Sequence, residues 1–264
     1  EIDPVYGEVK RDFDINPYSY ALNTSRALDP DEYYTRNYAP FNIKDELNNN
    51  YIDLNVQDIR VQGEVKYKVI PDLELSAIAA AKYTQTSQEH NILDGSNQAQ
   101  AYRAMGTSTI RASNPFLYTD PDNPYALPIS VLPNGGIYER SDNNMLSYDF
   151  RATANYSKTF ADKHIVNLFG GTEWAVIDRH NTWFRGWGLQ YTMGEIPNYA
   201  YQVFKQGSEE NSNYYTYGWL YDRSEAYFAN GTYSYMGKYV LNGTYRYEGT
   251  NKLGKSRSAR WLPT

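Results

Sequence analysis

Apolar and polar residues alternate without exception over two stretches of twelve residues. In residues 58–69 the apolar or small side chains occupy every odd-numbered position, and in residues 146–157 they occupy every even-numbered position. A period of two over this length is typical of a β-strand, whose successive side chains point to opposite faces. Weaker copies of the pattern bring the prediction to seven strands, at residues 5–13, 58–69, 72–84, 146–157, 164–178, 223–236 and 238–249.

The connections between these strands alternate strictly between short and long. The short ones are turns at residues 70–72, 160–163 and 236–238, and the long ones are residues 14–57, 85–144 and 179–222. Outer-membrane β-barrels have this layout, with tight periplasmic turns and long extracellular loops. The pattern therefore predicts an all-β fold, an antiparallel transmembrane β-barrel with long extracellular loops.

Tyrosines bracket three of the predicted strands at a spacing of eight residues. Eight steps of strand rise cover about 26 Å, and the tilt of barrel strands brings this close to the apolar thickness of a bilayer. Amphipathic rings favour both membrane interfaces. We therefore predict a membrane girdle in which Tyr148, Tyr227 and Tyr247 lie toward the outer leaflet and Tyr156, Tyr235 and Tyr239 toward the periplasm.

Composition and charge exclude several other classes of protein. The 264 residues include 28 tyrosines and no cysteine, with a net charge of −6 and a mean hydropathy of −0.72. No apolar run reaches the roughly 18 residues of a membrane-spanning helix. The negative net charge argues against nucleic-acid binding. The absence of cysteine excludes thiolate metal sites and disulfides. Seven strands, with residues 260–264 resembling the start of an eighth, suggest that residues 1–264 are an internal segment of one larger barrel domain.

The sequence contains no recognisable catalytic motif. The three histidines, His90, His164 and His180, form no metal-binding motif, and no nucleophile elbow or phosphate-binding loop occurs. We expect no enzymatic activity, no cofactor and no metal. Charged side chains instead repeat on the polar strand faces, where we expect them to line a polar lumen; they are Glu64, Lys66, Asp149, Arg151 and Arg246.

One aromatic segment is a candidate ligand-binding surface, because exposed rings usually mark a binding site. Its residues are Trp183, Phe184, Arg185, Trp187 and Tyr191. The alternative is that Trp183 and Trp187 belong to the outer girdle or pack the loop against its neighbours. The same two interpretations apply to Tyr214, Tyr215, Tyr217 and Trp219.

A water-soluble sheet would show the same alternation, with its polar face toward water. A soluble carbohydrate-binding module that uses Trp183 and Trp187 is therefore the alternative function, and a β-rich hydrolase is a more distant one. Strand length, alternating loop lengths and apolar faces rich in alanine and glycine favour the membrane interpretation.

The C-terminal part carries a family resemblance. Residues 227–254 read YFANGTYSYMGKYVLNGTYRYEGTNKLG, and Arg260-Trp261-Leu262-Pro263 follow. This hairpin resembles that of the SusC/RagA-type TonB-dependent transporters of Bacteroidetes, and residues 16–26 resemble a second segment of the family. Glu248, Thr250, Asn251 and Lys252 depart conservatively from the family pattern.

The resemblance implies a 22-strand barrel in the bacterial outer membrane, of which this chain would cover about seven to eight strands. It implies import of oligosaccharides or peptides, energised by the TonB complex and shared with a SusD-like surface lipoprotein. The plug, the TonB box and the N-terminal extension of such transporters are absent from this sequence.

Overall fold

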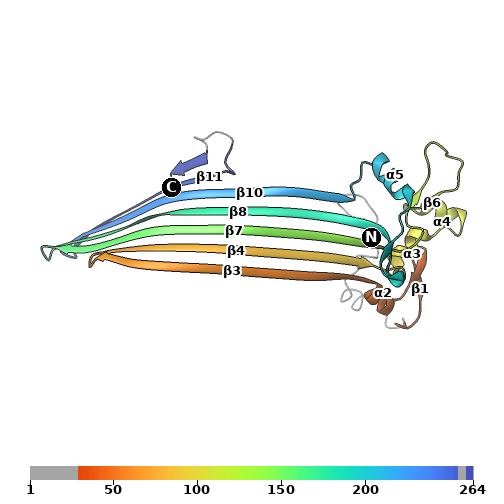
Figure 1. Ribbon diagram of the computed structural model, residues 1–264, viewed down its shortest axis with the longest axis horizontal. Helices are drawn as coiled ribbons and strands as arrows, with labels where there is room; N and C mark the ends of the chain where they lie inside the picture. The colour runs from red at the N-terminus through yellow and green to blue at the C-terminus, as the bar shows by residue number, and fades with distance from the viewer. Residues whose placement is uncertain (1–28, 255–259, 264) are drawn as a thin grey trace. The chain divides into compact units, whose positions relative to one another are not determined.

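The structure is a computed structural model that describes residues 29–254 and 260–263. Its main sheet has the strand order β12-β11-β10-β8-β7-β4-β3, and a short β9 pairs with β8 (Figure 1). The strands are β3 (Asn50–Ile70), β4 (Leu73–Ile92), β7 (Gly136–Phe160), β8 (His164–Gln190), β9 (Ile196–Pro197), β10 (Tyr215–Tyr235), β11 (Tyr239–Thr250) and β12 (Trp261–Pro263).

The predicted fold class is confirmed, since neighbours in the sheet follow one another along the chain as antiparallel strands. The described sheet is open, with β3 and β12 at its two edges. The three short turns are also confirmed, and two of them use left-handed backbone, at Ala161 and Asp162 and at Met236 and Gly237. The predicted strand at residues 5–13 lies outside the described residues.

The strands are longer than the alternation predicted. β3 begins at Asn50, β8 continues to Gln190 and β10 begins at Tyr215, so much of the expected long connections 14–57, 85–144 and 179–222 is strand. The alternation pattern did not predict these extensions because polar and aromatic residues occupy both faces there, as in Glu139-Arg140-Ser141-Asp142. A strand needs no apolar alternation where neither face is buried against an apolar layer.

Short elements fill the remaining connections. Asn42, Ser96 and Thr107 cap three of the helices by accepting hydrogen bonds from backbone N–H groups of the first turn. The elements are β1 (Tyr34–Arg36), β2 (Ala39–Phe41), α2 (Ile43–Asn49), α3 (Asn97–Arg103), α4 (Ser108–Ser113), β5 (Leu117–Tyr118), β6 (Ile129–Ser130), η2 (Tyr191–Met193) and α5 (Tyr201–Glu209).

The chain divides into two compact units. Of the described residues, one unit contains 29–54, 87–141 and 182–216, and is called the loop unit below. The other contains 55–86, 142–181, 217–254 and 260–263, and is called the strand unit. Among the described residues, no helix is long and apolar enough to cross a membrane.

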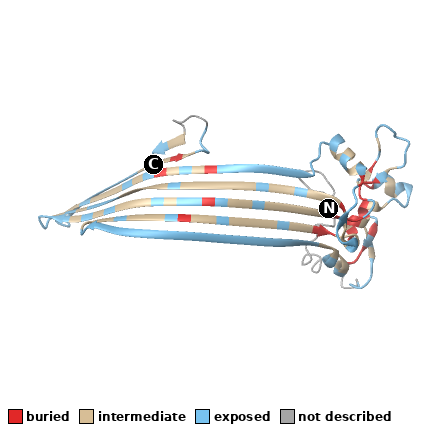
Figure 2. Cartoon of the chain, viewed as in Figure 1, coloured by how far each residue is buried: buried red, intermediate tan, exposed pale blue. Residues whose placement is uncertain are grey.

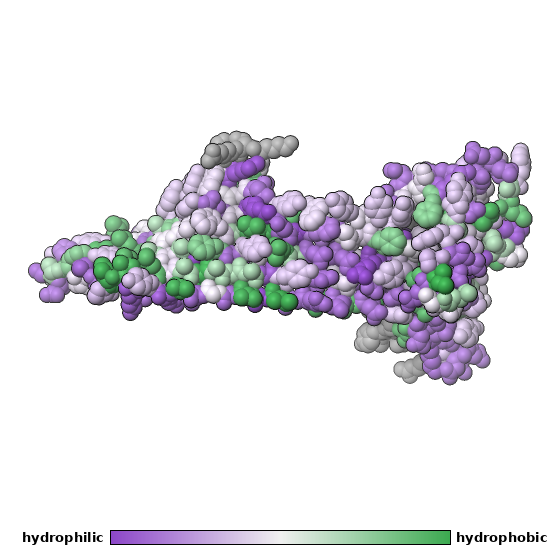
Figure 3. Space-filling view, viewed as in Figure 1, coloured by the Kyte–Doolittle hydropathy of each residue, from purple (hydrophilic) through white to green (hydrophobic). Residues whose placement is uncertain are grey.

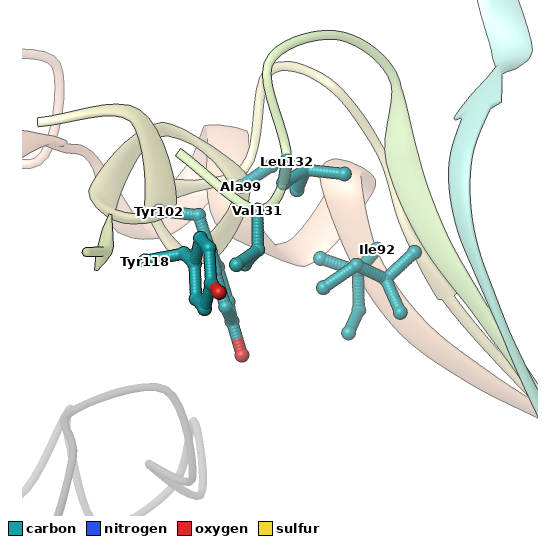
Figure 4. Close-up of a cluster of buried hydrophobic side chains, with 7 residues drawn as sticks. Ile92, Ala99, Tyr102, Tyr118, Val131 and Leu132 are labelled. Atoms are coloured by element: carbon teal, nitrogen blue, oxygen red, sulfur yellow. The ribbon is translucent and has the colours of Figure 1, made fainter. Parts of the chain in front are cut away.

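The loop unit holds a hydrophobic core (Figure 2). Ile92, Leu132 and Ile137 are at most 1% exposed, and Tyr102, Tyr118 and Val131 gather beside them (Figure 4). Gly188 and Gly135 allow close backbone approach near this core. Each has a φ of 75°, and a side chain on Gly188 would meet the carbonyl oxygen of Asn198 at 2.1 Å.

The strand unit has two different faces. Polar side chains of neighbouring strands bond to each other on one face, as Ser157 does to Asn167 at 2.6 Å. Apolar side chains on the other face stay uncovered by the described residues: Leu168 is 49% exposed, Trp174 45% and Leu241 72%. Figure 3 shows hydrophobic side chains gathered along the strands. In water, an apolar surface of this kind would promote association.

The core of the loop unit yields a stability prediction. Leu132 is 0% exposed whereas Leu127, five residues earlier, is 75% exposed. Leu132→Ala is expected to cost about 2–5 kcal/mol of local stability, because it leaves a cavity in the packed core. Limited proteolysis of the 93–135 connection should accelerate accordingly, and Leu127→Ala should leave the rate unchanged. Equal rates in the two variants would contradict this packing.

Candidate functional site

The polar face of the strand unit carries a chain of four charged residues. Arg151 in β7 donates through Nε to Glu173 Oε1 in β8 at 2.6 Å, and Arg246 in β11 donates through Nη2 to Glu173 Oε2 at 3.1 Å. Arg246 Nε reaches Glu248 Oε2 at 2.8 Å. Glu173 therefore joins two guanidinium groups, which the strand order places on either side of β10.

Phe228 of β10 lies between these two arginines. Its ring centroid is 5.7 Å from Arg151 Cζ and 6.0 Å from Arg246 Cζ, within range of cation–π attraction. A hollow of about 230 Å³ adjoins the cluster, with Arg60, Gln62 and Asp149 also in its lining. Ile78, Phe150 and Trp174 also line the hollow, so both charged and apolar side chains border it.

The structure places the five predicted lumen residues on this polar face. Arg151 and Arg246 meet through Glu173, whereas Glu64 pairs with Lys66 at 3.1 Å and Asp149 accepts a hydrogen bond from Ser147 at 3.1 Å. Sequence reasoning missed Glu173 and Glu248. Their positions could have been found by extending the alternation of β8 and β11, in which they occupy polar-face positions.

The tyrosines that were predicted to form the girdle in the C-terminal hairpin are neighbours across it. Tyr227 pairs with Tyr247 and Tyr235 with Tyr239 in the ladder. Trp261, which the sequence reasoning did not assign to the girdle, stacks on Tyr247 with ring centroids 4.8 Å apart and planes at 18°. Tyr148 and Tyr156 lie eight residues apart within β7.

The aromatic segment predicted as a loop is mostly strand. Trp183, Phe184, Arg185 and Trp187 belong to β8, and Tyr191 opens η2. The loop prediction was wrong because backbone pairing continues along this segment; for example, Leu189 pairs with Pro197 of β9.

Three of these residues pack within the loop unit. Trp187 meets Tyr102 edge to face at 5.4 Å. Arg185 Cζ lies 5.3 Å from the Trp183 ring and 5.6 Å from the Trp187 ring, and its Nε bonds Glu139 at 2.6 Å. Aromatic and ionic contacts thus fix Arg185 from three sides.

Tyr191 is an anchor of the loop unit. Its hydroxyl lies 3.1 Å from the Ile137 carbonyl oxygen and 3.2 Å from Asn91 Oδ1. Burial raises the pKa of this hydroxyl well above its ordinary value, so it stays a neutral donor. Both contacts are internal, which favours a structural role over ligand binding for Tyr191.

A pocket of about 290 Å³ lies in the loop unit. Tyr102, Phe116, Val131, Trp187 and Val203 contribute its apolar wall. Polar side chains that also line it are Arg185, Gln206, Glu210, Ser212, Asn213 and Tyr214. An apolar wall with several polar groups around it is the usual composition of a small-molecule or side-chain binding pocket.

An ionic clamp holds α5 beside this pocket. Lys205 of α5 reaches Asp120 at 2.7 Å and Asp122 at 3.5 Å, and its Nζ lies 5.7 Å from the Tyr118 ring. The hydrogen bond to Asp120 raises the pKa of Lys205 above its ordinary value, and the same bond lowers the pKa of Asp120. The Asp-Pro-Asp turn at residues 120–122 therefore positions a helix.

Comparison with known proteins identifies the fold. No protein-family model and no curated protein matches the chain. Solved structures do match: a RagAB peptide transporter with a TM-score of 0.54 and 16% identity over 85% of this chain, and the RagAB peptide importer in its closed-closed state, with a TM-score of 0.58 and 14% identity over 87%. The open-open state of that importer matches with a TM-score of 0.57 and 14% identity over 85%.

These likenesses show a shared fold. The chain covers 20–21% of the length of the matched chains, so it spans about a fifth of such a transporter structure. Among the described residues, no group of three or more His, Asp or Glu side chains could hold a metal ion.

The ionic clamp predicts a pH effect on α5. Asp120 has a pKa below its ordinary value of 3.8, so its stabilising contribution is complete above that value and is lost as the pH falls through the lower, folded-state pKa. Amide hydrogen exchange of residues 201–209 should therefore accelerate, relative to intrinsic rates, when the pH is lowered from 6 to about 2.

Two variants separate the clamp from general acid effects. Asp120→Asn should show fast exchange at both pH values and little acid dependence. Asp122→Asn, which changes a carboxylate 3.5 Å from Lys205 with its side chain 87% exposed, should behave nearly as the unaltered protein. Acid dependence that persists in full in Asp120→Asn would contradict the clamp.

Proposed function

We propose that the chain is a segment of the β-barrel of a SusC/RagA-type TonB-dependent transporter, which imports peptides or oligosaccharides across the bacterial outer membrane. The single observation that carries the proposal is a sheet of long antiparallel strands, apolar on one face and charged on the other. This arrangement suits a barrel wall between lipid and a polar lumen. The shared fold with the RagAB structures and the resemblance of the C-terminal hairpin support the proposal.

Transport past such a barrel wall does not require this chain to make or break covalent bonds. The polar-face cluster of Arg151, Glu173, Arg246 and Glu248 holds its charges in pairs, which gives a hydrated surface without a strongly attractive site. A cargo can pass such a surface because no single contact retains it. The chain is accordingly proposed to act as a conduit rather than as an enzyme.

Substrate contact is assigned to the loop-unit pocket. Its apolar wall fits a hydrophobic side chain or the flat face of a sugar, and the surrounding amides and charges fit the polar groups of either. Partners of the whole transporter are proposed to be a SusD-like surface lipoprotein, which would contact the loop unit, and the TonB complex. The matched RagAB structures are of a peptide transporter, which makes peptides the first cargo to test.

Import is tested in cells that lack the gene for the full-length protein. Uptake of fluorescent peptides or fluorescent oligosaccharides is compared between the deletion strain, the strain with the gene restored and the parent strain. We expect one of the two cargo classes to lose its uptake in the deletion strain and to regain it on restoration. Unchanged uptake of both classes would contradict the proposed import.

Contact between the apolar face and lipid can be tested by tryptophan fluorescence. Trp174 lies on that face and is 45% exposed, whereas Trp187 packs within the loop unit. In vesicles, a transporter whose only tryptophan is Trp174 should be strongly quenched by lipids brominated on the acyl chain, because the ring would contact those chains. A transporter whose only tryptophan is Trp187 should not be quenched. A protein that is monodisperse in water without detergent would contradict the membrane position altogether.

A further inference from the structure

The loop-unit pocket changes in character from its inner end to its mouth. Among its lining residues, Tyr102 is 6% exposed and Val131 3%, whereas Tyr214 is 43% exposed. Ser212 and Asn213, which also line the pocket, are exposed as well. The inner end is therefore apolar and the mouth polar. An occupant that fits both has an apolar part to bury and a polar part that stays at the mouth.

The aromatic rings of the lining do not form a flat platform. Tyr102 lies 3.9 Å from Phe116 with the ring planes at 39°, and 5.4 Å from Trp187 with the planes at 76°. Phe204 lies 5.5 Å from Tyr214 with the planes at 82°. A sugar ring stacks on one flat and open ring face, whereas tilted and edge-on rings give an uneven wall. Such a wall suits a side chain that can choose a rotamer to fill the space.

Polar side chains around the pocket are partly bonded to one another. Arg185 donates through Nε to Glu139 at 2.6 Å, and Gln206 donates through Nε2 to Glu210 Oε1 at 2.9 Å. A sugar carries hydroxyl groups around its ring, and each hydroxyl that is buried without a hydrogen bond costs free energy. The internal pairing reduces what these side chains can offer to such hydroxyls. An apolar side chain needs no partner of this kind.

The size of the pocket suits a single side chain on a longer molecule. Its volume of about 290 Å³ lies just below the range of ~300–1,000 Å³ for pockets that enclose a whole small molecule. The hydroxyl of Ser212 and the amide of Asn213 are groups that can hydrogen-bond to a peptide main chain. A peptide would thus keep its main chain at the polar mouth while one side chain enters the apolar end.

We propose that the loop-unit pocket binds one large apolar side chain of a peptide, such as leucine, and excludes sugar rings. The inference rests on the proposed import function and names the cargo class that the function left open between peptides and oligosaccharides. Burial of the side chain supplies most of the affinity. The main chain at the mouth is the same in every peptide, so this contact selects by side chain.

The test uses the purified full-length transporter in detergent and two fluorescent pentapeptides, Gly-Gly-Leu-Gly-Gly and Gly-Gly-Ala-Gly-Gly. Their dissociation constants are measured by fluorescence anisotropy. We expect the leucine peptide to bind about tenfold more tightly, because its larger side chain buries more apolar surface. An unlabelled linear glucose heptasaccharide should not displace the leucine peptide.

Two variants place the contact in this pocket. Phe204→Ala removes a ring from the lining, and Val203→Thr adds a hydroxyl group to the apolar wall at nearly unchanged shape. Both should reduce the preference for the leucine peptide. The matched control is Tyr201→Ala, which removes a 70% exposed ring of the same helix that does not line the pocket. It should leave the preference unchanged.

Equal binding of the two peptides would overturn the proposal. So would a preference that persists in full in both pocket variants, or displacement of the leucine peptide by the heptasaccharide. Cellular uptake separates this failure from failure of the proposed function. Uptake that is lost in the deletion strain while the purified transporter shows no leucine preference would overturn the pocket assignment alone. A leucine preference together with unchanged uptake in the deletion strain would count against import and leave the pocket assignment standing.

Discussion

Backbone N–H and C=O groups in the central strands of the main sheet find their partners on both neighbouring strands. In the proposed membrane position no water would be available to replace those partners, so the ladder would have to be continuous across the apolar band. This requirement accounts for the tight turns, which reverse the chain at Ala161-Asp162 and at Met236-Gly237 with left-handed backbone. It also fixes the register, and the register in turn decides which side chains meet on each face.

The polar-face cluster is a consequence of that register. Arg151, Glu173 and Arg246 come from three strands, and they meet because the ladder sets β7, β8, β10 and β11 side by side with matched heights. Opposite charges on neighbouring strands attract one another and like charges directly opposite repel. The side chains therefore alternate in sign across strands, and Phe228 fills the space between the two guanidinium groups.

Much of this arrangement could be predicted from the sequence, because a strict period of two determines both the strand and its two faces. The positions of Arg151 and Arg246 on the polar face followed from alternation alone. Their meeting through Glu173 did not, since strand register is set by contacts between residues far apart in the sequence. The strand extensions were missed for a different reason: where both faces are polar or aromatic, as near Glu139, the period carries no hydrophobic signal.

The loop-unit site illustrates the same limit. The segment from Trp183 to Tyr191 was recognised by its aromatic content, yet composition could not separate the anchor Tyr191 from the pocket residue Trp187. That difference arises from partners such as Tyr102 and Ile137, which come from other segments. The ion pair between Lys205 and Asp120 could likewise not be predicted from the sequence, because the Asp-Pro-Asp motif indicates only a turn.

One face of β10 shows how side-chain size follows the proposed surroundings along a single strand. Tyr235 and Tyr227 are the predicted girdle residues of this face, and Tyr233, Gly231 and Ala229 lie between them. Gly231 leaves room for Leu168 of β8, because a Cβ there would lie 3.3 Å from Leu168 Cδ2. Beyond Tyr227 the same face carries Glu225, which accepts a hydrogen bond from Trp174 Nε1 at 2.8 Å. Arg223, paired with Asp178, and the parallel rings of Tyr221 and Trp219 follow. A protein surface in water has no reason to change in this order. A surface that passes from acyl chains into polar headgroups, as the proposed membrane position requires, does, because its surroundings change from apolar to polar along the strand.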